Sequence, residues 1–218
     1  MTVGFEVYSD KGKLQVSSEA PNIQHIESLR LDGDIALDAA NYIYAVEPDD
    51  GSNIFSPVLQ EGKVYITGKG VVHVFSATAK KRSGSGIEVY DEAGGVMFSS
   101  EGLPLTVIDK LKIDITKDSK GYIASATPDQ RKYSVRTAYV ISSRIYFLNF
   151  IRSDISDQNY VIALQSVSSV EKLQDGTTRL GLKTPDNAKE IRVPRSSPRY
   201  RGSTCVALVI NASYLPKL

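Results

Sequence analysis

Ser169-Val170-Glu171-Lys172 is the segment that comes nearest to a nucleophile motif, because it matches Ser-x-x-Lys. In hydrolases that use this motif the serine attacks the substrate, and Ser-Asp-Asn and Lys-Thr-Gly motifs accompany it. The nearest segments here are Ser153-Asp154-Ile155 and Lys183-Thr184-Pro185, so both companions are missing. We therefore expect no hydrolase of this type.

The two histidines give no stronger indication of chemistry. Neither His25 nor His73 has a second histidine or a cysteine at the spacing that zinc ligands need. His73 alternates with Val71 and Phe75, which is typical of a core or cross-strand position. A Ser–His triad would need a serine that the pattern marks as a nucleophile, and none is marked. We predict no catalytic, metal-binding or cofactor-binding residues and expect no enzyme.

One segment, residues 189–201, stands out by charge, with five basic residues against one acid. Three interpretations stay open: a plain exposed loop, an extended arm that contacts an acidic protein surface, and a contact to nucleic-acid phosphate. We expect no nucleic acid, because the whole chain has a formal net charge of only +1. The candidate partner-contact residues are Arg192, Arg195, Arg199, Tyr200 and Arg201.

The elements that must position these residues are strands. Apolar and polar residues alternate through Phe5–Val7 and Leu14–Val16, and Ser9-Asp10-Lys11-Gly12 between them is typical of a tight turn. No segment shows sustained helical periodicity, although 36–40 could form a short helical turn. Further strands are expected at 23–31, 42–46, 63–67, 71–76, 105–108, 111–115, 121–126, 138–142, 145–151, 161–167, 170–173, 178–182 and 204–210.

The chain also repeats itself. Residues 4–19 recur at 86–101 with eight of sixteen positions identical, against about one expected from average composition. At the same offset Ile26–Asp32 resembles Ile108–Asp114, and with a shift of two Tyr42-Ile43 resembles Tyr122-Ile123. The repeat predicts that one domain has been duplicated.

We therefore predict an all-β protein of two related β-sandwich-like domains with a C-terminal β extension. The expected boundaries are 1–79 for the first repeat, 80–85 for a polar linker, 86–153 for the second repeat and 154–218 for an extension that packs on the second repeat.

Composition and charge indicate in which compartment the chain is made and what it could contact. The single cysteine, Cys205, excludes an intrachain disulfide and lies in an apolar run, so we expect it to be buried. The sequence begins without a basic region followed by an apolar stretch, and its apolar runs fall short of the ~20 residues of a membrane span. We expect synthesis in a cytoplasm and no membrane partner. The first eighty residues carry a net negative charge and the rest a net positive one, which fits either chance variation over two solvated surfaces or head-to-tail contacts between subunits.

The repeated segment, Gly4-Phe5-Glu6-Val7-Tyr8-Ser9-Asp10-Lys11-Gly12, resembles the start of small structural proteins of tailed bacteriophages. In these a Gly–apolar–x–Val–aromatic–Asn/Asp–x–x–Gly hairpin opens a β domain. The resemblance implies a non-enzymatic structural protein of the virion, made in the host cytoplasm. It would contact other virion proteins in the tail, tail-fibre region or capsid surface, within a homo-oligomer or symmetric assembly.

The alternative prediction is a carbohydrate- or receptor-binding β module. It draws on tyrosines at equivalent places in the two copies, which can serve as sugar platforms or interface anchors. The pairs are Tyr8 with Tyr90, and Tyr42 with Tyr122.

Overall fold

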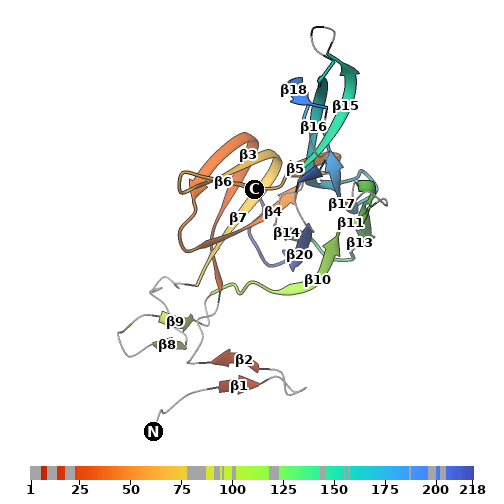
Figure 1. Ribbon diagram of the computed structural model, residues 1–218. Helices are drawn as coiled ribbons and strands as arrows, with labels where there is room; N and C mark the ends of the chain where they lie inside the picture. Colours follow the sequence, from red (N-terminus) through yellow and green to blue (C-terminus); the bar gives the residue numbers. More distant parts are fainter. Residues whose placement is uncertain are drawn as a thin grey trace.

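The structure is a computed structural model of the 218-residue chain. It describes residues 6–8, 14–17, 23–77, 87–90, 94, 96–99, 102–117, 123–142, 146–154, 156, 158–186, 188–195, 200–201 and 205–218. The described residues contain strands and turns and no helix, so the all-β prediction is confirmed (Figure 1). None of these residues belongs to a helix able to cross a membrane.

The strands of the first half are β1 (Glu6–Tyr8), β2 (Leu14–Ser17), β3 (Gln24–Asp38), β4 (Tyr42–Pro48), β5 (Ser52–Phe55), β6 (Val58–Gln60), β7 (Lys63–Ser76), β8 (Glu88–Tyr90) and β9 (Val96–Ser99). Those of the second half are β10 (Val107–Lys112), β11 (Asp114–Lys117), β12 (Ile123–Thr127), β13 (Asp129–Lys132), β14 (Thr137–Ile141), β15 (Tyr146–Ser153), β16 (Tyr160–Lys172), β17 (Thr177–Lys183), β18 (Ile191–Pro194), β19 (Tyr200–Arg201) and β20 (Val206–Asn211).

Most of these strands form one antiparallel sheet that curls into a nearly closed barrel. Its main path is β10-β20-β14-β4-β7-β5-β16-β15-β19, and β17 and β13 branch from β16. The branch brings β13 back beside β10, where the Lys112 backbone N–H donates to Asp129 Oδ2 at 3.2 Å. Arg131 Nη1 donates to Asp109 Oδ2 at 3.3 Å across the same seam. Side chains therefore close the gap between the two edges.

This single sheet corrects the prediction of two sandwich-like domains. Strand β4 lies in the first copy and β14 in the second, yet they pair at Val46 and Tyr139. Strand β5 pairs with β16, whose residues belong to the expected C-terminal extension. Long-range pairing thus joins the parts that the repeat pattern separated, whereas the proposed sequence boundaries themselves stay a prediction.

The duplication is visible in the two small hairpins. Glu6 pairs with Ser17 and Val7 with Val16 in β1–β2, and Glu88 pairs with Ser99 and Val89 with Phe98 in β8–β9. Both ladders shift register directly after the valine. The predicted pairing of the two strands in each hairpin is confirmed, and it joins segments that lie close together in the sequence.

The barrel interior holds the larger core. Alternate residues of β4, β7, β14 and β20 point inward, and the core of fully buried side chains includes Val46, Val72, Tyr139 and Val209. Cys205 belongs to this core, as the apolar run predicted. Tyr139 also donates or accepts a hydrogen bond with Thr178 Oγ1 at 2.7 Å, so its hydroxyl is satisfied inside the barrel.

A second, smaller core lies outside the barrel wall. It contains Ala45, Phe75, Ala138 and Ile210, which alternate with the inward residues of their strands. Leu215, from the segment after β20, covers them. The final residues, 211–218, therefore act as a strap over the outer face of β4, β7 and β14.

Strand β7 replaces the two strands expected at 63–67 and 71–76. Gly68 and Gly70 have φ angles of +146° and +156°, which residues other than glycine rarely adopt. A Cβ on Gly70 would lie 2.1 Å from the carbonyl oxygen of Glu47 on the paired strand β4, and a Cβ on Gly68 would lie 2.4 Å from that of Asn53 on β5. The glycines therefore let β4 and β5 approach β7 closely, and the strand continues through them. The short helical turn that the sequence allowed at 36–40 does not form, since β3 extends to Asp38.

Replacement of Gly70 by alanine tests whether this close approach of β4 to β7 requires glycine. We expect a loss of at least about 3 kcal/mol in the free energy of unfolding, because the new Cβ meets backbone in a strained conformation. Gly62→Ala is the matched control: its φ is +74°, but nothing lies within 4 Å of its Cβ. That change should cost only about 1–2 kcal/mol. If urea unfolding gave equal losses of unfolding free energy for the two variants, the close approach of β4 at Gly70 would not be a steric constraint.

Candidate functional site

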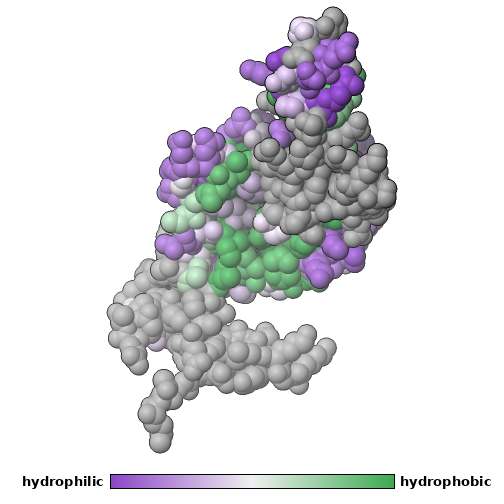
Figure 2. Space-filling model, viewed as in Figure 1, coloured by the Kyte–Doolittle hydropathy of each residue, from purple (hydrophilic) through white to green (hydrophobic). Residues whose placement is uncertain are grey.

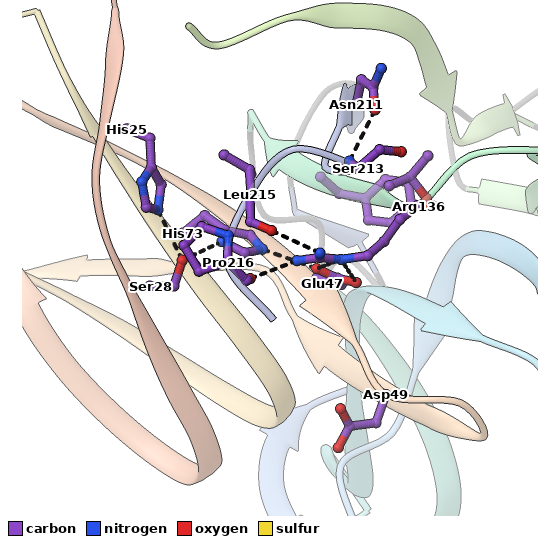
Figure 3. Close-up of polar contacts among 12 residues, drawn as sticks. His25, Ser28, Glu47, Asp49, His73, Arg136, Asn211, Ser213, Leu215 and Pro216 are labelled. Carbon is purple, nitrogen blue, oxygen red and sulfur yellow. Dashed lines mark hydrogen bonds and ion pairs between the residues drawn. The ribbon is translucent and has the colours of Figure 1, made fainter. Parts of the chain in front are cut away.

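Two features of the described residues combine polar side chains in a way that could serve a function. The first is a network under the strap on the outer barrel wall, drawn in Figure 3. The second is a projecting sheet of β15, β16, β18 and β19, which we call the arm and which carries the predicted basic segment (Figure 1).

The network begins at two histidines that share one serine. Ser28 Oγ on β3 lies 2.9 Å from His25 Nε2 and 2.8 Å from His73 Nδ1. His73, on β7, is fully buried and its Nε2 lies 3.0 Å from Glu47 Oε2. Because a carboxylate can only accept, the His73 nitrogen donates in this contact. The prediction of a core or cross-strand position for His73 is confirmed.

The network ends at the strap. Arg136 Nε donates to both Glu47 oxygens, at 2.7 and 3.0 Å, and Glu47 lies on β4. The other two Arg136 nitrogens donate to the backbone carbonyls of Leu215 and Pro216, at 2.9 and 2.8 Å. The planar guanidinium therefore ties the strap to the barrel wall through a partly buried carboxylate.

The electrostatics of Glu47 follow from these contacts. Burial alone would raise the pKa of its carboxyl group, since it disfavours the charged form. Hydrogen bonds from His73 and Arg136, together with their charges, outweigh burial and lower that pKa below its ordinary value of 4.5. Glu47 is thus held ionised as the acceptor of the network.

Ser28, His73 and Glu47 have the residue types of a hydrolase triad, but their arrangement favours a structural role. Triad carboxylates orient one histidine nitrogen and leave the ring free to exchange protons with the serine and the substrate. Here the His73 ring is fully buried, Ser28 is shared with a second histidine, and Glu47 is bound by Arg136. Every polar group is used to hold β3, β4, β7 and the strap together.

A polar pocket of about 220 Å³ opens beside this network, next to Arg136. Its charged residues largely neutralise one another: Lys172 Nζ lies 2.8 Å from Asp50 Oδ1, and Arg30 forms a two-pronged ion pair with Asp49. The described residues hold no group of three or more histidine, cysteine, aspartate or glutamate side chains that could bind a metal.

The arm is the second feature. Strands β15 and β16 pair over Tyr146–Ser153 and Val161–Val167, β18 pairs with β16, and β19 pairs with β15 at its base. The segment interpreted as a loop, an arm or a nucleic-acid contact thus supplies two strands of a sheet. Figure 2 shows hydrophilic side chains gathered at the end of the arm.

Arg192 and Arg195 fasten β18 to the rest of the arm. Arg192 Nε lies 2.5 Å from Asp154 Oδ2, and its guanidinium carbon lies 3.8 Å from the centre of the Tyr160 ring. Arg195 donates through Nε to the Gln158 carbonyl at 3.0 Å and through its backbone N–H to the Asn159 carbonyl. Hydrogen bonds from Ser156 and Arg192 lower the pKa of Asp154, so this carboxylate anchors the turn at the end of the arm.

The other predicted contact residues are less informative. Tyr200 and Arg201 lie in β19, where they pair with Phe147 and Tyr146, and their side chains lie outside the described residues. Arg199 lies outside the described residues altogether. Of the five predicted residues the structure therefore places two side chains, and it brings both to the end of the arm.

Sequence reasoning missed Ser28, Glu47 and Arg136. One signal was present: Glu47 and His73 each interrupt an apolar strand, and a polar group at a buried position requires a partner. Their pairing depends on β4 lying beside β7, with Ala45 opposite His73, which local patterns do not state. In comparisons with protein-family models, curated proteins and solved structures, nothing matched this chain.

Loss of the Arg136 guanidinium should loosen the strap. We expect Arg136→Met to lower the free energy of unfolding by roughly 2–4 kcal/mol, because the partly buried Glu47 carboxylate keeps only the His73 donor and the Leu215 and Pro216 carbonyls lose their donors. Arg152→Met is the control, since the Arg152–Glu190 pair is half exposed and should contribute less than about 1 kcal/mol. Urea unfolding measures both, and faster amide exchange in 211–216 would report the strap directly. Equal effects of the two changes would contradict the tether.

Glu47 should make this tether sensitive to acid. Since the pKa of Glu47 is lower in the folded than in the unfolded chain, its contribution is complete above about pH 4.5 and is lost as pH falls through the folded value. Glu47→Gln lacks this contribution. The difference in unfolding free energy between the wild type and Glu47→Gln should therefore shrink on acidification from neutral pH to below pH 4. A constant difference across that range would show that the Glu47 charge does not stabilise the fold.

Proposed function

We propose that this chain is a non-enzymatic structural protein of a bacteriophage virion that acts through protein–protein contacts. Its partners would be other virion proteins, including further copies of itself, in the tail, tail-fibre region or capsid surface. It would be made in the host cytoplasm and incorporated into the particle during assembly.

The observation that carries the contact role is the arm. It extends beyond the barrel and its strands β15 and β18 border the sheet, so it offers backbone groups and side chains that the barrel core does not use (Figure 1). Ile151, on β15, is about half exposed at 47%. A projecting sheet of this kind suits a contact with another protein better than it suits a concave small-molecule site.

Support for the virion comes from the repeated hairpin. Its residue pattern resembles the start of phage structural proteins, and both copies form hairpins with the same register and the same irregularity. Two equivalent hairpins in one chain would let it make two similar contacts without new contact chemistry.

The alternative, a carbohydrate- or receptor-binding module, draws on exposed tyrosines. Tyr42 and Tyr90 are exposed at 42% and 43%. Tyr122 and the side chain of Tyr8 lie outside the described residues, so the proposed equivalence of the two copies at these positions stays a prediction.

Quantitative mass spectrometry of purified particles tests the virion proposal. We expect the chain to copurify with the particles, because a structural component survives washing that removes host proteins. Copy numbers in small multiples of three or six would place it in the tail, and copies on the order of hundreds would place it on the capsid surface. Absence of the chain from washed particles would overturn the proposal.

A further inference from the structure

Strand β3 leaves one edge of the sheet open. It pairs with β7 along its whole length, and the register runs from Gln24 opposite Ser76 to Asp38 opposite Lys63. Only its first residues meet a second segment, where His25 N–H donates to the Leu103 carbonyl at 2.8 Å. From Glu27 onward no other described strand lies beside β3. An exposed strand edge of this length is a template for a further strand.

The open edge is acidic. Residues 27–38 contain four acids and one base. Glu27, Asp32 and Asp34 are exposed and form no ion pair with a described residue. The single base, Arg30, is already paired with Asp49. A strand that adds to this edge therefore fits best if it brings positive charge.

The arm ends in an edge of the opposite kind. Among the described strands β18 pairs only with β16, so its other side borders the sheet. Of the described charged residues within and beside it, Lys189, Arg192 and Arg195 are basic and Glu190 is acidic. Arg192 and Arg195 hold β18 in place through Asp154 and Gln158, so the strand is already extended and costs little to order.

We propose that β18 of one copy adds to the β3 edge of a second copy, which joins two barrels head to tail through one continuous sheet. The inference rests on the proposed contact role of the arm and names its partner as this chain. Two β3 edges repel each other, and so do two basic segments, so the unlike pairing is the one that charge favours. Each copy keeps one edge of each kind, and repetition therefore yields a ring or a filament.

The test uses charge reversal on each edge of the full chain. Asp32→Lys with Asp34→Lys reverses the charge of the β3 edge, and Lys189→Glu with Gln158→Glu adds negative charge to the arm while the Arg192 and Arg195 anchors of β18 stay in place. Sedimentation velocity at low salt should show that the wild type associates as its concentration rises. Each double variant should bind at least about tenfold more weakly, and salt should weaken the wild type in the same way.

Mixing the two variants gives the sharpest outcome. One supplies an intact arm and the other an intact β3 edge, and the reversed edge and the reversed arm again carry opposite charges, so an equimolar mixture should regain the association that each variant alone has lost. Glu61→Lys with Asp50→Lys adds the same charge as the β3 variant at the β6–β7 and β4–β5 turns, away from β18, and should associate like the wild type. Circular dichroism and thermal unfolding identify any variant that fails to fold.

Three results would overturn the inference: a wild type that stays monomeric at every concentration, an arm variant that associates normally, or a mixture that stays monomeric. A normally associating arm variant would instead indicate pairing of two β3 strands. If particles contain the chain but the purified protein stays monomeric, the virion proposal stands and only the contact between copies fails.

Discussion

The double pairing of β7 is the constraint on which the rest of the structure depends. One edge of this strand is occupied by β3 along its length, and the other by β4, β5 and β6 in succession. These three strands follow one another along that edge, and β4 and β5 lie so close to β7 that a Cβ on Gly70 or Gly68 would meet their backbone. The two glycines therefore allow the close approach of the neighbouring strands at the middle of β7.

The position of β7 between β3 and β4 also determines where polar groups must find hydrogen-bond partners. His73, on β7, lies on the outer wall between Ser28 on β3 and Glu47 on β4, away from the barrel core. A charge at this depth is costly unless it is bonded on all sides. Arg136 and the strap meet that need and in the same step cover the apolar residues around Phe75. Polar satisfaction and apolar burial thus depend on the same terminal segment.

Whether a feature of the fold was predictable depends on how far apart in the sequence its interacting residues lie. The hairpin of Glu6–Ser17 was predicted from a turn pattern within a few residues, and its strand pairing was correct together with that of its copy. The turn at Asp175-Gly176 is local in the same way, because Asp175 accepts a hydrogen bond from the Thr177 N–H. The joining of the two copies through β4 and β14 was not predictable, because it reflects competition among many β strands of similar composition. The position of Glu47 in an apolar strand indicated a buried polar group that needs a partner, but it did not indicate which residue that partner is.

A nearly closed sheet leaves few places where backbone groups face outward, and those places decide how the molecule meets others. Around the barrel, side chains of Asp109, Asp129 and Arg131 close the seam between β10 and β13, so that gap offers little to a partner. The long edge of β3 and the border of the arm are not closed in this way by described strands. Their charges have opposite signs, so each discourages pairing with its own kind while remaining open to the other. The charges that keep each edge from pairing with its own kind are therefore the same charges that would select the other edge as partner.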